Sequence, residues 1–245
     1  KDKELKDVEI KSRVLEIEGG FVRFSAIRDI SEQKRIERES KHRSEFESLL
    51  TEISARFLTN TFEGAETGIF QSIREICLHN KLNAGYLLIR KEHGFELKAG
   101  WSDGQISDFD KFSAHVNEIP EYRLNRFRKS QAVIINSTAE IHQEAPDFKE
   151  NLENYGINSL IEIPAVSEED LSGVLCFLSK STRKGWNEYE VKFLQMITQI
   201  FVSVLEREKS RKELIKSESK FRSIFNNTSF GIFQITQNGE IILSN

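Results

Sequence analysis

The spacing of hydrophobic positions predicts two helices near the start of the chain. Residues 31–58 contain no Gly or Pro, and their apolar side chains are at first sparse. They then recur at steps of three and four residues, as Phe46, Leu49, Leu50, Ile53 and Phe57. This spacing places them on one helical face, so a polar connector becomes an amphipathic helix that can dock on a domain. A second helix is predicted from Ala65 to His79.

Further along, the period shortens to that of strands. Apolar and polar residues alternate from Phe95 to Trp101, after a turn at 91–94. Compact apolar runs predict four more strands, at 86–89, 133–135, 159–166 and 173–178. A short helix around Leu152 is closed by Gly156. Asn187 and Glu190 have the spacing of a capping box at the start of a last, long helix.

This order of elements predicts an α+β fold, with an antiparallel sheet, helices on one face and long N- and C-terminal helices. In the last helix, a seam with steps of four and three residues runs through Phe193, Ile197, Ile200, Val204, Arg207, Arg211, Leu214, Glu218, Phe221 and Phe225. The heptad stripe predicts pairing of two chains, weakest at residues 207–211. The alternative is a helix that packs on its own sheet up to Leu205 and continues as a solvated connector.

The two flanks have strand patterns of their own. Alternating runs at 8–17 and 21–27 surround a turn at 18–20, which predicts a hairpin. Asp29 is placed to cap the following helix, with Glu32 in the capping-box position. At the other end, residues 231–236 and 241–245 predict two strands. Such small pieces bury little core, so we expect an interior segment of a longer protein.

Composition limits the class of protein. The net charge of −4 does not predict a nucleic-acid-binding surface. The basic cluster Arg123, Arg126, Arg128 and Lys129 is expected to be solvated helix surface. No apolar run is long enough to span a membrane. Cys77 and Cys176 lie in apolar runs without metal-ligand spacing, which fits buried thiols and a cytoplasmic location.

The stretch from Gly156 to Ile197 carries a family resemblance. Its motifs are Gly-Ile-Asn-Ser-Leu-Ile-Glu-Ile-Pro-Ala at 156–165, Gly-Val-Leu-Cys-Phe at 173–177, and Trp-Asn-Glu-Tyr-Glu at 186–190 followed by Phe193, Leu194 and Ile197. These resemble the motifs of the GAF domain. The Arg-Asp-Ile-Ser-Glu-Gln-Lys segment at 28–34 resembles the exit of a PAS domain, and 219–245 resembles the entry to another. The resemblance implies PAS strands at 1–30, a helical linker at 31–44, a GAF domain at 45–207, a coiled-coil linker at 208–218 and a PAS fragment at 219–245.

Such arrays occur in bacterial sensor proteins of the histidine kinase or diguanylate cyclase type. The resemblance therefore implies a sensory module of a two-component or similar signalling system. It would bind a small ligand and relay the change through the terminal helices of a homodimer. The alternative is a ligand-free module that dimerises and spaces the PAS domains. We expect no catalysis in this segment, because it contains no catalytic motif and His42 lacks the flanking residues of a phosphoacceptor.

The ligand pocket implied by the resemblance would lie under residues 102–156. Trp101 would form an aromatic wall, and the candidate polar contacts are His115, Tyr122, His142 and Tyr155. The segment contains no cysteine, so covalent attachment of a pigment is not expected. The sequence identifies no cofactor and no metal site. In the ligand-free alternative, the pocket is filled by Phe109, Phe112, Phe127 and Phe148.

Overall fold

The computed structural model describes residues 5–17, 20–59, 64–106, 119–141, 146–167, 170–182, 185–227, 233–236, 238 and 241–244. The chain divides into two compact units, residues 1–53 and 54–245. The division lies within a single helix, α1 (Ser31–Leu58).

The first unit begins with a two-stranded antiparallel ribbon. Strand β1 (Val8–Ile17) pairs along its whole length with β2 (Gly20–Asp29), and Val8 lies opposite Asp29. The predicted hairpin strands are therefore confirmed, whereas Glu18 and Gly19 of the predicted turn lie outside the described residues. The ribbon exposes large apolar side chains, among them Phe21 at 79% and Ile27 at 69%.

The second unit is built on a five-stranded sheet in the order β4-β3-β7-β6-β5, with every neighbouring pair antiparallel. The sheet confirms the α+β class and the strands that the sequence predicts. The elements of this unit are α2 (Ala65–Asn80), β3 (Ala84–Arg90), β4 (Phe95–Ser102), α4 (Glu121–Arg128), β5 (Val133–Ile135), η1 (Thr138–Glu140), α5 (Pro146–Asn154), β6 (Ser159–Ser167), β7 (Asp170–Ser179), α6 (Glu188–Asn227), β8 (Phe233–Ile235) and β9 (Ile241–Ser244).

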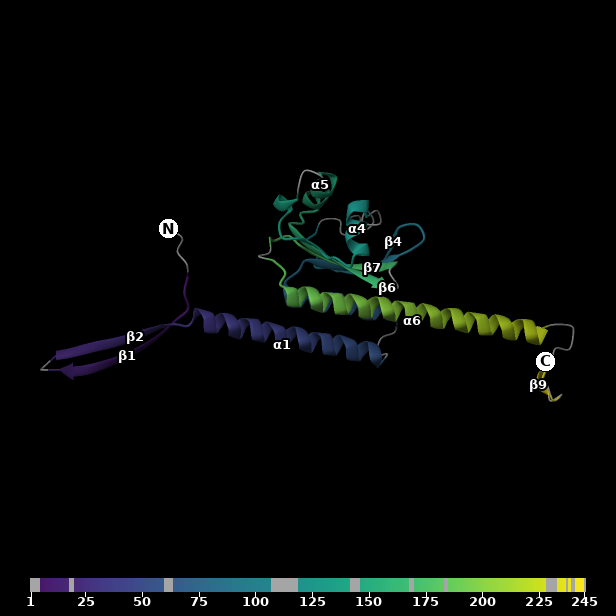
Figure 1. Ribbon diagram of the computed structural model, residues 1–245, viewed down its shortest axis with the longest axis horizontal. Coiled ribbons are helices and arrows are strands. Elements are labelled where there is room, and N and C mark those ends of the chain that lie inside the picture. The colour runs from purple at the N-terminus through teal and green to yellow at the C-terminus, as the bar shows by residue number, and fades with distance from the viewer. Residues whose placement is uncertain are drawn as a thin grey trace. The chain divides into compact units, whose positions relative to one another are not determined.

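Helix α6 runs along one face of the sheet (Figure 1). Helix α2 packs on β3 and β4 and against α6. The backbone approaches them closely at two glycines. A Cβ atom on Gly85 would lie 2.9 Å from Ile73 of α2, and one on Gly173 would lie 3.2 Å from Val202 of α6 and 2.7 Å from the carbonyl oxygen of Leu88. Because real Cβ atoms do not approach so near, these glycines set the distance between the sheet and its helices.

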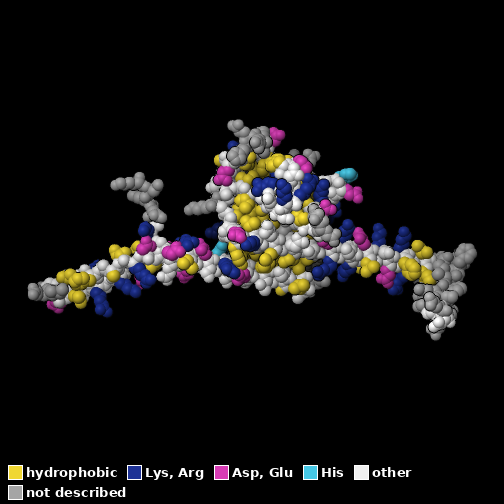
Figure 2. Space-filling view, in the orientation of Figure 1, with side chains coloured by type: hydrophobic (Ala, Val, Ile, Leu, Met, Phe, Trp, Pro, Cys, Tyr) yellow, Lys and Arg dark blue, Asp and Glu magenta, His cyan; other side chains and the backbone are white. Residues whose placement is uncertain are grey.

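Helix α6 changes environment along its length. It starts with the predicted capping box: the Asn187 N–H donates to Glu190 Oε2, and the Glu190 N–H donates to Asn187 Oδ1, both at 2.9 Å. Its side chains are buried on the sheet as far as Val202, and every residue from Lys209 to Ile224 is exposed. Figure 2 shows basic and hydrophobic side chains side by side along this exposed stretch.

Helices α4 and α5 lie on the opposite face of the sheet (Figure 1). Helices α2 and α6 thus share one face of the sheet, and the short helices α4 and α5 cover the other. Helix α5 ends where predicted, with Gly156 just beyond it at a φ of 69°. Under these helices lies a continuous apolar cluster that includes Leu88, Phe127, Leu152, Ile157 and Leu178.

Candidate functional site

One row of residues crosses the sheet beneath α4 and contains polar side chains. The strand register aligns Val133 of β5 with Glu162 of β6, Glu162 with Cys176 of β7, and Cys176 with Tyr86 of β3. Directly paired residues of antiparallel strands point to the same face. Glu162, Cys176 and Tyr86 are all at most 2% exposed. The register therefore places a carboxylate, a thiol and a phenol side by side in the core.

Arg123 of α4 supplies the opposite charge. Its Nη2 donates to Glu162 Oε1, and the two side chains are only 5% and 2% exposed. The guanidinium also lies over the ring of Phe148 from α5, 4.5 Å from the ring centroid. Helix α4 packs on β6, which carries Glu162, so the contact follows from the placement of the helix. A cation on an aromatic face in a dry site adds an attraction to that of the ion pair.

This ion pair has two unused polar atoms. Arg123 Nε and Glu162 Oε2 are buried, and neither has a hydrogen-bond partner among the described residues. Buried polar groups are nearly always hydrogen-bonded, because an unpaired one retains the full cost of its desolvation. The pair therefore offers one donor and one acceptor on the face that α4 and α5 cover.

The neighbouring groups stay uncharged at physiological pH. Burial raises the pKa of Tyr86, and the neighbouring Cys176 and Glu162 raise it further. Burial and Glu162 likewise raise the pKa of the Cys176 thiol, whose Sγ lies 3.6 Å from Glu162 Oε1. Tyr86 is hydrogen-bonded to this thiol. The row thus presents one negative charge, balanced by Arg123, beside two neutral hydrogen-bonding groups.

The residues that the sequence predicts to line the pocket lie in different parts of the domain. Tyr155 is partly buried and packs against the cluster under α4 and α5. Tyr122 is 48% exposed beside Arg123. Trp101 lies opposite Gly85 in the register, on the face toward α2, away from Tyr86. His115 and His142 lie outside the described residues. Of the residues that the structure describes, Tyr155 thus lies at the apolar cluster and Tyr122 near the Arg123–Glu162 pair. Whether these residues contact a ligand stays a prediction.

The residues proposed to fill the pocket are also divided. Phe127 is fully buried in the cluster, and Phe148 is partly buried against it. Phe109 and Phe112 lie outside the described residues. Apolar packing therefore occupies part of this face, next to the ion pair.

The sequence pattern did not reveal the pairing of Arg123 with Glu162. It grouped Arg123 with exposed neighbours, which is correct for Arg126, Arg128 and Lys129 but wrong for Arg123, which is 4% exposed. A usable signal was present in β6, where Glu162 stands among apolar residues that are all buried. A carboxylate at such a position requires a partner, because an unpaired buried charge is strongly unfavourable.

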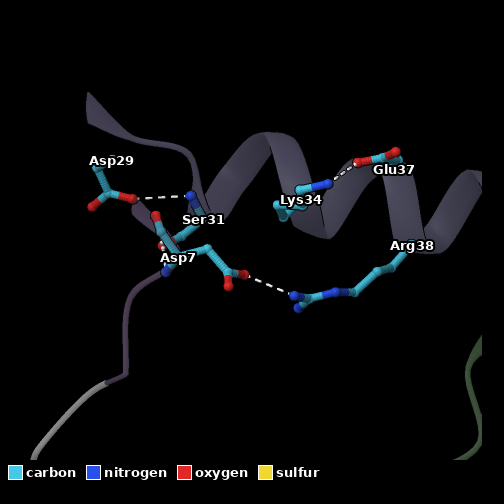
Figure 3. A network of polar contacts seen from close by, with 6 residues as sticks. All are labelled: Asp7, Asp29, Ser31, Lys34, Glu37 and Arg38. Atoms are coloured by element: carbon cyan, nitrogen blue, oxygen red, sulfur yellow. Dashed lines mark hydrogen bonds and ion pairs between the residues drawn. The ribbon is translucent and has the colours of Figure 1, made fainter. Parts of the chain in front are cut away.

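A second polar network lies in the first unit, where the ribbon joins α1 (Figure 3). The Ser31 N–H donates to Asp29 Oδ1 at 3.0 Å, the Asp7 N–H donates to Ser31 Oγ at 2.9 Å, and Arg38 pairs with Asp7 at 2.8 Å. The bonds from Ser31, together with Lys6, lower the pKa of Asp29 to about 2. Asp29 therefore receives the amide of Ser31 at the helix start, as expected, whereas Glu32 pairs with Arg35 instead of completing a capping box.

The described residues contain no cluster of His, Cys, Asp and Glu side chains suited to a metal ion. Among the described helices, none combines the length and the apolar character needed to cross a membrane.

Comparison with known proteins identifies the family. The GAF domain model matches residues 68–204, and the chain belongs to this family. The match lies within the range of 45–207 that the sequence motifs implied. A search of curated proteins finds no match.

Solved structures share the fold at low sequence identity. A phycoerythrobilin-bound GAF domain from a cyanobacterial phytochrome has a TM-score of 0.55 and 16% identity, over 68% of this chain and 97% of that one. A phycocyanobilin-bound GAF domain, also from a cyanobacterial phytochrome, has a TM-score of 0.54 and 17% identity, over 66% and 94%. The GAF domain of a phosphoenolpyruvate-protein phosphotransferase from Coxiella burnetii has a TM-score of 0.52 and 12% identity, over 70% and 98%.

Proposed function

We propose that this chain is a sensory and regulatory GAF module that binds a small molecule under α4 and α5 and relays the change through α6. The observation that carries the proposal is the buried Arg123–Glu162 pair with its two unused polar atoms. A few polar groups in an apolar site are typical of small-molecule pockets. Two structurally similar GAF domains hold a bilin, so this fold is able to enclose a ligand.

The relay would use the contact between α6 and α2. Glu208 accepts a hydrogen bond of 2.9 Å from the Ala65 N–H, in the first turn of α2, and also pairs with Lys212. It is the last partly buried residue before the exposed stretch of α6. A negative side chain at a helix N-terminus is favourable. A shift of α6 would break this contact, so the exposed stretch and the sheet domain are coupled mechanically.

The partner on α6 would be a second copy of the chain. Leu214 and Phe221 of the seam are 69% and 57% exposed, and Ile215 and Ile224 beside the seam are 55% and 59% exposed. In a parallel, in-register dimer, Arg207, Arg211 and Glu218 would each meet the same charge on the partner. Like charges in the seam weaken pairing locally, so this part would be able to change its packing. A ligand biases such an equilibrium only by binding its two states differently.

The wider setting is part of the same proposal. The terminal strand pairs would belong to PAS domains, the module would act in the cytoplasm, and a kinase or cyclase elsewhere in the protein would provide the output. The segment itself would carry out no catalysis.

A thermal-shift screen of nucleotides and small metabolites tests ligand binding. A ligand at a hundred times its Kd adds about 2.7 kcal/mol to the stability, which shifts the melting temperature measurably. The double variant R123M/E162M is the control and is expected to lose the shift. The absence of any shift with the wild type would favour a ligand-free module.

Sedimentation equilibrium tests the relay helix. The wild type is expected to dimerise, R207L/R211L to dimerise more tightly, and L214E/F221E to be monomeric. In the full-length protein, R207L/R211L is expected to lock the output in one state. A monomer at all concentrations, or an unchanged output with R207L/R211L, would contradict the relay.

The ligand-free dimerisation and spacing module remains a second candidate. The complete burial of Phe127 favours it, since this side chain occupies space under α4. In that case the ion pair would only fix α4 on the sheet. Dimerisation without any thermal shift would select this candidate.

A further inference from the structure

The row of Glu162, Cys176 and Tyr86, together with Arg123, limits the chemical class of ligand that the proposed site is able to bind. We infer that the site takes a small, flat, uncharged molecule that presents an N–H and a C=O side by side, as a cyclic amide does. This inference rests on the proposed ligand-binding function and on the Arg123–Glu162 pair.

The charge balance of the site is unfavourable for a charged ligand. The side chains of Arg123 and Glu162 are both at least nine-tenths buried and neutralise one another, and raised pKa values keep Tyr86 and Cys176 uncharged. An anionic ligand would meet the Glu162 carboxylate, and a cationic one would meet the guanidinium. In a site of low dielectric constant, either addition leaves one charge uncompensated.

The unused atoms specify a matching pair of groups. Glu162 Oε2 is an acceptor and Arg123 Nε–H is a donor. The two side chains are already joined through Nη2 and Oε1, so covalent geometry keeps the unused atoms within reach of one small molecule. A ligand N–H directed at Oε2 and a ligand C=O directed at Nε–H would satisfy both.

The surroundings favour a flat ring. The aromatic ring of Phe148 lies under the guanidinium, and Phe127 and Tyr155 belong to or pack against the same cluster. Aromatic walls stack on flat molecules. The combination of a planar face and adjacent donor and acceptor is that of a heterocyclic lactam.

Four probes of similar size test the class on the whole chain. 2-Pyridone has the required edge, N-methyl-2-pyridone lacks the N–H, and benzoate and benzamidinium carry the two charges. Binding is followed by protein-observed NMR or calorimetry. We expect 2-pyridone to bind at least about tenfold more tightly than N-methyl-2-pyridone, because the methylated probe leaves the buried Oε2 without a donor. We expect neither charged probe to compete.

The variant R123M/E162M is the matched control. Replacing a buried ion pair with apolar residues of similar volume usually preserves the fold, and its unfolding curve checks this. The variant is expected to lose 2-pyridone binding. Equal binding to the folded variant would show that the pair is not the anchor and would overturn the inference.

The remaining outcomes separate this inference from the proposed function. If benzoate, benzamidinium or a charged metabolite binds and 2-pyridone does not, the class is wrong while the sensory function stands. If neither the probes nor the metabolite screen gives binding, both proposals fail.

Discussion

The two faces of the five-stranded sheet differ in chemistry. The face toward α2 and α6 has close apolar packing, with Gly85 and Gly173 allowing the backbone to approach the helices. The face toward α4 and α5 carries a carboxylate, a thiol and a phenol in one row, with a buried guanidinium above them. The first arrangement holds a long helix in place. The second contains polar groups that packing alone does not require.

Stability alone does not explain this difference between the two faces. A buried ion pair is commonly no more stabilising than apolar residues of the same volume, since desolvation offsets the attraction. The α2 and α6 face shows that this sheet is able to pack without charges. Under the proposed function the polar row would serve recognition, and the predictions below test the contrast between the faces.

The largest effect on stability is expected when one partner of the Arg123–Glu162 ion pair is removed. E162M leaves the Arg123 charge buried without a partner, so it should lower the free energy of unfolding by about 3–5 kcal/mol. R123M/E162M should stay within about 1 kcal/mol of the wild type or exceed it. Urea unfolding measures both. A double variant as unstable as the single one would show that the pair itself is required for folding.

On the opposite face, G173A should lower the free energy of unfolding by about 1–3 kcal/mol, because the new methyl group meets the backbone carbonyl of Leu88. G85A should lower it less, since the nearest neighbours of the new methyl group are the side chains of Phe177 and Ile73, which are able to shift. S172A, a change on the neighbouring residue, is the control and should be nearly neutral. Equal stability of all three variants would mean that this face is loosely packed.

At the start of α6, N187A should lower the free energy of unfolding by about 1 kcal/mol, because it removes the acceptor for the Glu190 N–H. N187D retains an acceptor and should restore most of the loss. Thermal unfolding compares the three proteins. A loss that N187D fails to restore would assign the effect to something other than the cap.

The smallest effect concerns the contact between α6 and α2. The Lys212 side chain and the Ala65 amide lower the pKa of Glu208. Because the folded-state pKa is depressed, the stabilisation is complete above the ordinary carboxylate pKa and is lost as the pH falls through the folded value. Carboxyl NMR titration should show the low pKa, and K212M should bring it closer to normal. An ordinary pKa in the wild type would contradict the contact.

The sequence predicted most of the secondary structure because those signals are local. Alternation in β4, the apolar runs of β6 and β7, the spacing of Asn187 and Glu190, and Gly156 after α5 each act over a few residues. The GAF motifs also lie in these elements, so the family followed from the same residues. The face of the sheet assigned to Trp101, and the burial of Arg123, could not be obtained in this way.

Only the tertiary structure decided the site. Arg123, Glu162, Cys176 and Tyr86 come from four elements, of which only β6 and β7 are consecutive in the chain. They meet because of the order β3-β7-β6 and the register between these strands. A shift of one residue in that register would turn Glu162 to the other face. Periodicity determines which side chains share a face of their own strand or helix, whereas pairing between distant segments determines which of them become neighbours.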